Sequence, residues 1–268
     1  MEGEVRDMAK VYVIGAAKGG TAKTVSSYNL AYSLAEKGKK VLAMDMDPQA
    51  NLTTCFGVDD TTEVPVTIGH LMMAVLEEEE LPDTSEYIWE RDGVDFIPAS
   101  MMLSAVDAKL RLEMGTEKIL SRILDEVKDG YDTVIIDTCP SMGALTINAL
   151  SAADYVIVTA NPQLLAMKGL QDFLKTVSKI KNRINDKLQV AGVLLTICEG
   201  RTNLCKTITE EVQDTFKGKL KVFESMVPST VKVGESVYYG QPLMEYAPET
   251  KACEAYRELA KEVMAYEG

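Results

Sequence analysis

Short apolar runs alternate along this chain with longer stretches in which apolar residues recur every three or four positions. The short runs are rich in β-branched residues and are followed by Gly, Pro or small polar residues, which is typical of buried strands. They predict strands at 10–17, 40–47, 93–100, 132–137, 154–160, 189–197 and 220–228.

The longer stretches have the periodicity of amphipathic helices. They predict helices at 25–39, 116–131, 142–153, 167–184, 203–218 and 249–266. Strands that alternate with helices of this length form βαβ units, and unbroken apolar runs such as 155–160 are expected of strands buried on both faces. The pattern predicts an α/β fold with a doubly wound, mainly parallel sheet and helices on both faces.

The domain organisation follows from the evenness of this pattern. The chain has 268 residues, of which 46% are hydrophobic, and shows no linker, repeat or low-complexity tract. We therefore expect a single domain spanning 1–268, with an N-terminal extension at 1–9. The stretch 57–92 has the least regular pattern, so irregular, mobile or partner-specific structure is expected there.

Composition narrows the class of protein. The net charge of −13 disfavours a protein coated with a nucleic-acid-binding surface, although a local basic patch on an acidic body stays open. The five cysteines form no C-x-x-C pair, which supports neither a zinc site nor a disulfide framework. The absence of any apolar run near 18 residues predicts no membrane span, and the expected location is the cytoplasm.

Residues 16–31 (AAKGGTAKTVSSYNLA) place a small-residue loop and a Lys-Thr pair between a predicted strand and a predicted helix. In the usual phosphate-binding loop, G-x-x-x-x-G-K-[ST], backbone N–H groups and the helix N-terminus face the phosphates, and the Ser or Thr hydroxyl binds Mg²⁺. This chain has Ala17 and Ala22 in place of the framing glycines, and a second lysine, Lys18, besides Lys23. The segment alone therefore leaves an ordinary strand–helix turn as an alternative.

Three aspartates strengthen the case for a phosphate site. Asp45 and Asp47 lie at the end of the second predicted strand, and Asp137 ends another after four apolar residues. Open α/β sheets bind ligands at the carboxyl ends of their strands, where a carboxylate can hold Mg²⁺ through water. A helix or turn cap would explain any one of these aspartates, but it explains the three together poorly.

Taken together, five segments resemble the ParA/Soj partition ATPases, which belong with MinD among the deviant Walker-A ATPases. The similarity extends from about residue 10 to 265. The segments that carry it occur in the family's order and spacing: KGGTAKT (18–24), DMDPQANLT (45–53), TVIIDTCPSMGALTINALSAADYVIV (133–158), LLTICEGRTNL (194–204) and VPSTVKVGESVYYGQPL (227–243).

The resemblance assigns roles to the loop and its surroundings. It implies ATP and Mg²⁺ as cofactors, with Lys18 reaching across a nucleotide-sandwich homodimer to the phosphates of the facing subunit. Lys18 would act there as an arginine finger does elsewhere. The residues that the resemblance places on the nucleotide are Lys18, Gly19, Gly20, Thr21, Ala22, Lys23, Thr24 and Val25 around the phosphates, and Val227 and Pro228 near the adenine.

The resemblance also implies a slow, partner-stimulated hydrolysis of ATP to ADP and phosphate. Asp47 would orient or deprotonate the attacking water, with Asp45 as its structural neighbour. Thr24 and Asp137 would hold Mg²⁺, and residues 138–143 would form the second switch. Ala22 departs from the family, which has glycine there; a positive φ at this residue would cost alanine about 1–2 kcal/mol, and a negative φ almost nothing.

The function that the resemblance implies is partition of a plasmid, mobile element or chromosome. The ATP-bound dimer would bind nonspecific DNA, associate with the nucleoid, and respond to a ParB-like centromere-binding protein. The matching DNA contacts are Arg201 and Lys232, whereas Ser229 stands where many relatives have a further arginine. Because the chain is acidic, we expect modest and strongly salt-dependent DNA binding, and both cations could be ordinary solvated charges.

Three other functions are weighed against partition. A ParA-like ATPase that positions a protein cargo is hardly separated from it by sequence. A MinD-like membrane ATPase would end in a basic amphipathic helix, but this chain ends CEAYRELAKEVMAYEG, and no membrane binding is expected. A reductase like the nitrogenase iron protein needs paired cluster cysteines, and only Cys139 lies near a suitable loop.

Overall fold

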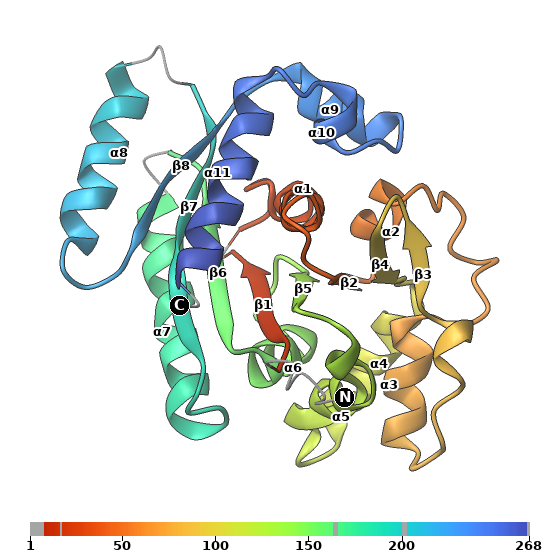
Figure 1. The fold of residues 1–268 in the computed structure, drawn as a ribbon. Coiled ribbons are helices and arrows are strands. Elements are labelled where there is room, and N and C mark those ends of the chain that lie inside the picture. Colours follow the sequence, from red (N-terminus) through yellow and green to blue (C-terminus); the bar gives the residue numbers. More distant parts are fainter. Residues whose placement is uncertain (1–7, 17, 163–165, 200–202, 267–268) are drawn as a thin grey trace, which may run out of the picture.

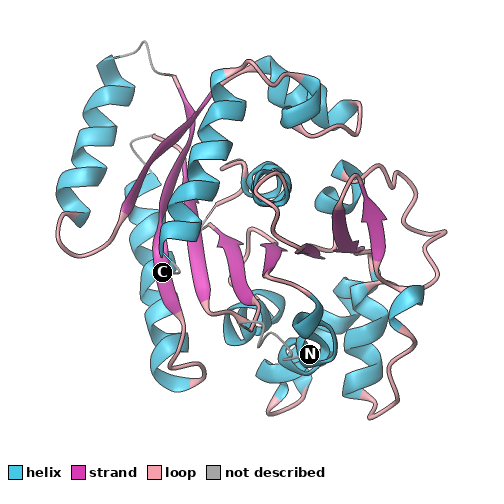
Figure 2. Cartoon of the chain, in the orientation of Figure 1, coloured by secondary structure: helices cyan, strands magenta, loops and turns pink. Residues whose placement is uncertain are grey.

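The computed structural model describes residues 8–16, 18–162, 166–199 and 203–266. In these ranges eight strands form one continuous sheet that crosses the molecule (Figures 1 and 2). The strands are β1 (Lys10–Gly15), β2 (Val41–Met46), β3 (Trp89–Arg91), β4 (Val94–Ile97), β5 (Thr133–Thr138), β6 (Tyr155–Ala160), β7 (Gln189–Cys198) and β8 (Val222–Pro228).

The sheet has the strand order β3-β4-β2-β5-β1-β6-β7-β8. Its neighbouring strands pair in parallel, with the exception of the antiparallel pair β3–β4 at one edge. Strands β1 and β2 are consecutive in the chain but lie on either side of β5 in the sheet. Helix α1 (Lys23–Ala35) therefore connects them as a crossover, where a hairpin would join adjacent antiparallel strands. The predicted doubly wound, mainly parallel sheet is confirmed.

Helices cover both faces of this sheet. Their bounds are α1 (Lys23–Ala35), α2 (Asn51–Cys55), α3 (Ile68–Leu76), α4 (Met102–Leu112), α5 (Ile119–Val127), α6 (Ala144–Ala152), α7 (Ala166–Arg183), α8 (Asn203–Phe216), α9 (Val231–Tyr238), α10 (Leu243–Tyr246) and α11 (Lys251–Tyr266). Short 3₁₀ turns occur at Thr84–Glu86, Thr116–Lys118 and Lys128–Gly130.

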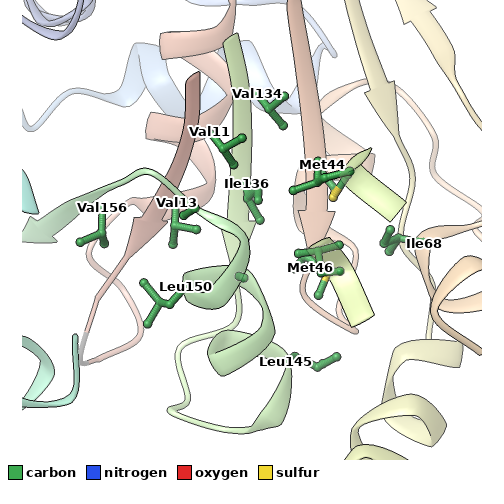
Figure 3. Packing of buried hydrophobic residues seen from close by; sticks show 14 of the residues in the cluster. Val11, Val13, Met44, Met46, Ile68, Val134, Ile136, Leu145, Leu150 and Val156 are labelled. Atoms are coloured by element: carbon green, nitrogen blue, oxygen red, sulfur yellow. The ribbon is translucent and has the colours of Figure 1, made fainter. Parts of the chain in front are cut away.

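Two hydrophobic cores lie on the two faces, because side chains of a strand alternate between them. Val11 and Val13 of β1 point into the core that α3 to α8 cover. Tyr12 and Ile14, the alternate residues, point into the core beneath α1, α2, α10 and α11. Figure 3 shows the first core, with Val11 and Val13 on the same side as Leu150 of α6.

The predicted strands and helices are all present, but the sequence pattern missed several elements. The stretch 57–92, expected to be irregular, contains α3 and the edge strand β3. Helix α4 was also missed, although Leu103, Val106 and Leu110 recur at helical spacing and are buried. The other missed elements are α2, α9 and α10, of four to eight residues, which are too short for periodicity to indicate.

The parallel arrangement brings the carboxyl ends of β1, β2 and β5 together. In register, Ile14 of β1 lies beside Asp137 of β5, and Asp45 of β2 lies on the other side of Asp137. Loops that follow these three strands therefore meet at one edge of the sheet. This is the edge at which ligands bind in open α/β sheets.

Candidate nucleotide site

The loop between β1 and α1 opens directly into the N-terminus of α1. Gly20 has φ of +75°, which glycine adopts without strain, and Ala22, the residue before the helix, has φ of 54°. No side chain caps α1, so the N–H groups of its first turn remain available to a ligand. Such a helix N-terminus attracts phosphate through these donors and through the helix dipole.

The loop is fixed from beneath by neighbouring strands. The hydroxyls of Thr21 and Thr159 lie 2.9 Å apart, and Thr196 Oγ1 donates to the carbonyl oxygen of Thr21 at 2.9 Å. Where the loop begins, a Cβ on Gly15 would lie 2.4 Å from Cζ of Phe173, so only glycine fits beneath α7. β6, β7 and α7 thus hold the loop in place while its tip stays open.

The two lysines of the loop have different environments. Lys23 is the first residue of α1 and is only 7% exposed. Lys18 lies at the exposed tip and lines a small pocket with Thr21, Asn161 and Leu170. Lys23 is therefore placed to neutralise charge inside its own loop, whereas Lys18 is exposed at the tip.

A buried carboxylate lies directly behind the loop. Asp137 is fully buried, and it accepts hydrogen bonds from Thr24 Oγ1 at 2.7 Å and from Ser27 Oγ at 3.0 Å. Burial, and then the neighbouring Asp45 carboxylate, raise the pKa of Asp137 to about 7, against the opposing effects of the Thr24 hydroxyl and the Lys23 ammonium. A cation at this position would favour the ionised carboxylate.

Asp45 organises the turn that follows β2. It accepts hydrogen bonds from the backbone N–H of Asp47 at 3.0 Å, and from the N–H and hydroxyl of Thr53 at 2.9 and 2.8 Å. The Thr53 oxygen in turn accepts the N–H of Ala99, which ties α2 to the end of β4. Burial raises the pKa of Asp45 to about 6, although the Thr53 and Asp47 donors lower it.

This turn presents Asp47, the residue expected to act on water. Asp47 is 7% exposed, and its Oδ1 accepts the N–H of Gln49 at 2.9 Å. The N–H of Ala50 donates to the carbonyl oxygen of Asp47, and Ala50 itself has φ of 52°. Asp47 is thus held by its own turn at the same sheet edge as the phosphate loop.

The expected second switch, 138–143, connects β5 to α6 beside the phosphate loop. Thr138 Oγ1 donates to the carbonyl oxygen of Ile14, and Thr146 Oγ1 donates to that of Ser141 at 2.6 Å. A Cβ on Gly19 would lie 3.9 Å from Cβ of Pro140, so the two loops are in close reach of each other. A conformational change in one loop can therefore displace the other.

Other predicted site residues are less well placed. The side chain of Val227 is 3% exposed and packs in the core beneath α1 and α11, so only its backbone could approach a base; Pro228 is half-buried at the strand end. Lys232 Nζ lies 2.8 Å from Glu235 Oε2 and 5.5 Å from the centroid of the Tyr246 ring. Arg201 and Ala17 lie outside the described residues.

Several contributing residues were not found from the sequence. Ser27 could have been, because it lies three residues after Thr24 and so on the same face of α1. Thr53, Thr159 and Thr196 act through contacts between residues 8 to 175 positions apart. No local pattern marks such contacts.

The donor set fits a magnesium nucleotide. A hydroxyl and one carboxylate, Thr24 and Asp137, leave most positions around a hard cation to phosphate and water, which is how Mg²⁺ is bound in nucleotide sites. Within the described ranges no cluster of three or more His, Cys, Asp or Glu side chains forms an all-protein metal site. Lys23 and the first N–H groups of α1 supply the donors that triphosphate requires.

The fold and this site define a P-loop nucleotide-binding protein, and comparison with known proteins agrees. The AAA-domain family matches residues 9–190. The chain is 36% identical over 258 residues to the sporulation initiation inhibitor protein Soj of Bacillus subtilis, which covers 96% of this chain and 99% of Soj. It is 33% identical over 257 residues to the chromosome partitioning protein ParA of Myxococcus xanthus, covering 96% and 88%.

Among solved structures, the chain resembles cobyrinic acid a,c-diamide synthase of Mycobacterium smegmatis with bound ADP and magnesium. The TM-score is 0.80 at 31% identity, over 95% of this chain and 93% of that one. The chain therefore belongs to the AAA-domain family, among the Soj/ParA partition ATPases. The resemblance drawn from the sequence is confirmed, and the ligands of the solved structure agree with the expected ATP and Mg²⁺.

Proposed function

We propose that this protein is a Mg·ATP-dependent dimerisation switch that acts in partition of a plasmid, mobile element or chromosome. The observation that carries the proposal is that the two lysines of the loop differ in burial. Lys23 is buried beside the Thr24–Asp137 pair, while Lys18 is exposed at the tip of the same loop. One nucleotide could therefore be bound within a subunit and completed by a second subunit.

Asp47 and Lys18 carry the proposed chemistry. Asp47 orients the attacking water and takes its proton, because the carboxylate lies at the phosphate edge and is preset by its turn. Lys18 of the facing subunit stabilises the charge that develops on the transferred phosphoryl group. Bound Mg²⁺ offsets phosphate charge, and Thr24 and Asp137 are the residues that would hold it.

The partners follow from the family. Relatives in this family are named for chromosome partitioning, which supports a DNA-associated cargo and a ParB-like protein that stimulates weak hydrolysis. The ATP-bound homodimer would bind nonspecific DNA and so associate with the nucleoid, leaving the nucleotide-free monomer in the cytoplasm. Arg201 and Lys232 are the DNA contacts that the resemblance supplies, although the charge of Lys232 is already countered by Glu235.

Positioning of a protein cargo is the second candidate. The ion pair of Lys232 and the net charge of −13 favour it, since both weaken the expected DNA surface. A membrane role has no such support. No helix in the described ranges is long and apolar enough to cross a bilayer, and the apolar face of α11 is buried against β8 and α1.

Lys18→Ala tests the proposal when compared with Asp47→Ala by sedimentation in excess Mg·ATP. Asp47→Ala should bind ATP, lose hydrolysis by roughly 10²–10⁴-fold and accumulate as a dimer. Lys18→Ala should still bind ATP as a monomer, because Lys23, Thr24 and the helix N-terminus are untouched.

Lys37→Ala is the matched control, because Lys37 is an exposed lysine after α1, remote from the loop tip. It should dimerise as the parent protein does. Dimerisation of Lys18→Ala at parental ATP concentrations would contradict the trans-acting role. A parent protein that stays monomeric with Mg·ATP would overturn the switch itself.

A further inference from the structure

Strand β7 contains a strained residue close to the phosphate loop. Ile197 has φ of 54°, although it lies within the strand. Among the described residues, five other than glycine have positive φ, and Ile197 is the only one of them with a β-branched side chain. In the left-handed region the Cβ of such a residue crowds a backbone carbonyl oxygen, so the conformation is unfavourable by itself. Contacts around Ile197 must therefore hold it.

Packing of the Ile197 side chain does not explain this conformation. The residue is 39% exposed, so little of its side chain is fixed by a core. Pairing with β8 is also irregular here, because the register shifts between Leu195 and Cys198. Thr196 and Ile197 lie within this irregularity, which we name the β7 bulge. The bulge needs another contact to keep it in place.

The hydroxyl of Thr196 supplies that contact and ties the β7 bulge to the phosphate loop. Thr196 is fully buried, and its Oγ1 donates to the carbonyl oxygen of Thr21 at 2.9 Å. A second contact, to the carbonyl oxygen of Ala160, is longer at 3.4 Å. Thr21 lies between the two lysines of the loop, so a loop that shifts when phosphate binds displaces the atom that Thr196 holds.

On its other side the β7 bulge is connected to α9. Cys198 directly follows the bulge, and its carbonyl oxygen accepts the N–H of Ser229 at 3.1 Å. The next residue, Thr230, caps α9 by accepting the N–H of Lys232. Figure 1 shows β8 running beside β7 and leading into α9. A short series of contacts therefore joins the phosphate loop to the N-terminus of α9.

We propose that Thr196 is a positioning residue that transmits the nucleotide occupancy of the phosphate loop to α9. The inference deepens the proposed function, since it requires this loop to bind the phosphates of ATP, and α9 carries the proposed DNA contact Lys232. Two opposed effects set two states of the bulge. The strain at Ile197 favours its release, and the hydrogen bond from Thr196 to Thr21 favours its retention.

Bound phosphate shifts this balance. It fixes the loop, and with it the Thr21 carbonyl, so the hydrogen bond from Thr196 is kept for more of the time. The β7 bulge and the start of α9 are then held together. In the nucleotide-free protein the strain releases the bulge more often, and the N–H of Ser229 becomes accessible to water.

Hydrogen–deuterium exchange followed by mass spectrometry tests this proposal in two segments, the loop at 18–24 and the start of α9 at 226–232. Mg·ADP is the probe, because its phosphates occupy such a loop without forming an ATP-bound dimer, and sedimentation verifies the monomer. In the parent protein Mg·ADP should slow exchange in both segments, by about 5-fold at 226–232. Thr196→Val should retain slowing in the loop alone, and Thr196→Ser, which keeps the hydroxyl, should behave as the parent.

Ile197→Gly and Ile197→Ala form a matched pair. Both remove the side chain, but only glycine relieves the strain of a positive φ. Ile197→Gly should show slow exchange at 226–232 with and without Mg·ADP, while Ile197→Ala keeps the nucleotide dependence. Because coupling is reciprocal, Ile197→Gly should also bind Mg·ADP up to about 5-fold more tightly, measured by calorimetry. Equal behaviour of the two variants would overturn the role of strain.

The remaining outcomes separate this inference from the proposed function. Slower exchange in the parent loop with no change at 226–232 overturns the transmission and leaves nucleotide binding intact. Nucleotide-dependent slowing at 226–232 that persists in Thr196→Val overturns the role of Thr196, and it indicates a route through α1, where Asn29 Oδ1 accepts the N–H of Leu243. A parent protein in which Mg·ADP slows neither segment overturns the phosphate site itself, and this inference with it.

Discussion

The phosphate loop and the Asp47 turn are built alike but held differently. Each follows a parallel strand, and each leads into a helix through an alanine with positive φ, Ala22 before α1 and Ala50 before α2. The tip of the phosphate loop is exposed, and its Thr21 is anchored from below by Thr159 and Thr196. The Asp47 turn is tied across three elements through buried Asp45 and Thr53.

The difference matches what each segment must do. A loop that receives phosphates needs free donors, so its helix N-terminus stays uncapped and its tip stays open. A carboxylate that acts on water needs a fixed position, since small displacements of a catalytic group lower rates strongly. Under the proposed function, the same strand–turn–helix unit would therefore serve as an open binding loop in one place and as a rigid support for a catalytic carboxylate in the other.

The largest expected effect is on ATP binding by the phosphate loop. Lys23→Ala should abolish measurable ATP binding, with affinity reduced by at least about 100-fold, because Lys23 is an almost fully buried cation in the loop that is proposed to bind the phosphates. Titration calorimetry measures this, with Lys37→Ala as an exposed control. Retained micromolar affinity would show that this loop is not the phosphate site.

An intermediate effect, on turnover, is expected from a change in the Asp47 turn. Thr53→Val removes the hydroxyl that links Asp45 to Ala99 while keeping the β-branched shape. Turnover should fall about 10-fold with ATP affinity unchanged, because Asp47 is displaced while the phosphate loop is intact. Thr53→Ser restores the hydroxyl and should recover turnover; equal losses in both variants would point to packing instead.

The same variant has a pH signature. The pKa of Asp45 is already raised to about 6 in the fold, and losing a donor to its ionised form raises it further. A carboxyl with a raised pKa binds more protons when folded, so it lowers stability as pH increases through the folded pKa. The stability lost by Thr53→Val should therefore be small near pH 5 and grow toward pH 8, measured by urea unfolding.

The smallest effect should separate the two alanines. Glycine relieves the left-handed strain, so Ala22→Gly and Ala50→Gly should each raise the free energy of unfolding by about 0.5–1 kcal/mol, or Tm by about 2 °C. Only Ala22→Gly should also tighten ATP binding, because Ala22 precedes the phosphate-binding turn. Calorimetry that shows tighter binding in both variants, or in neither, would remove this distinction.

Much of the site was readable from the sequence for a local reason. Lys23, Thr24 and Asp137 occupy strand ends and a helix start, and those positions follow from periodicity and from the rule that parallel strands end at one edge. Thr24 and Asp137, 113 residues apart, meet at 2.7 Å. Helix α4 had equally readable spacing and was missed, whereas α9 and α10 were too short to read.

The sequence by itself determined the βαβ alternation, the phosphate loop and the strand-end carboxylates, because each depends on neighbours within a few residues. Only the tertiary structure decided the positive φ of Ala22, the burial of Val227 and the ion pair that occupies Lys232. Such features depend on strand register and on packing between distant segments, and these are fixed only when the chain folds as a whole.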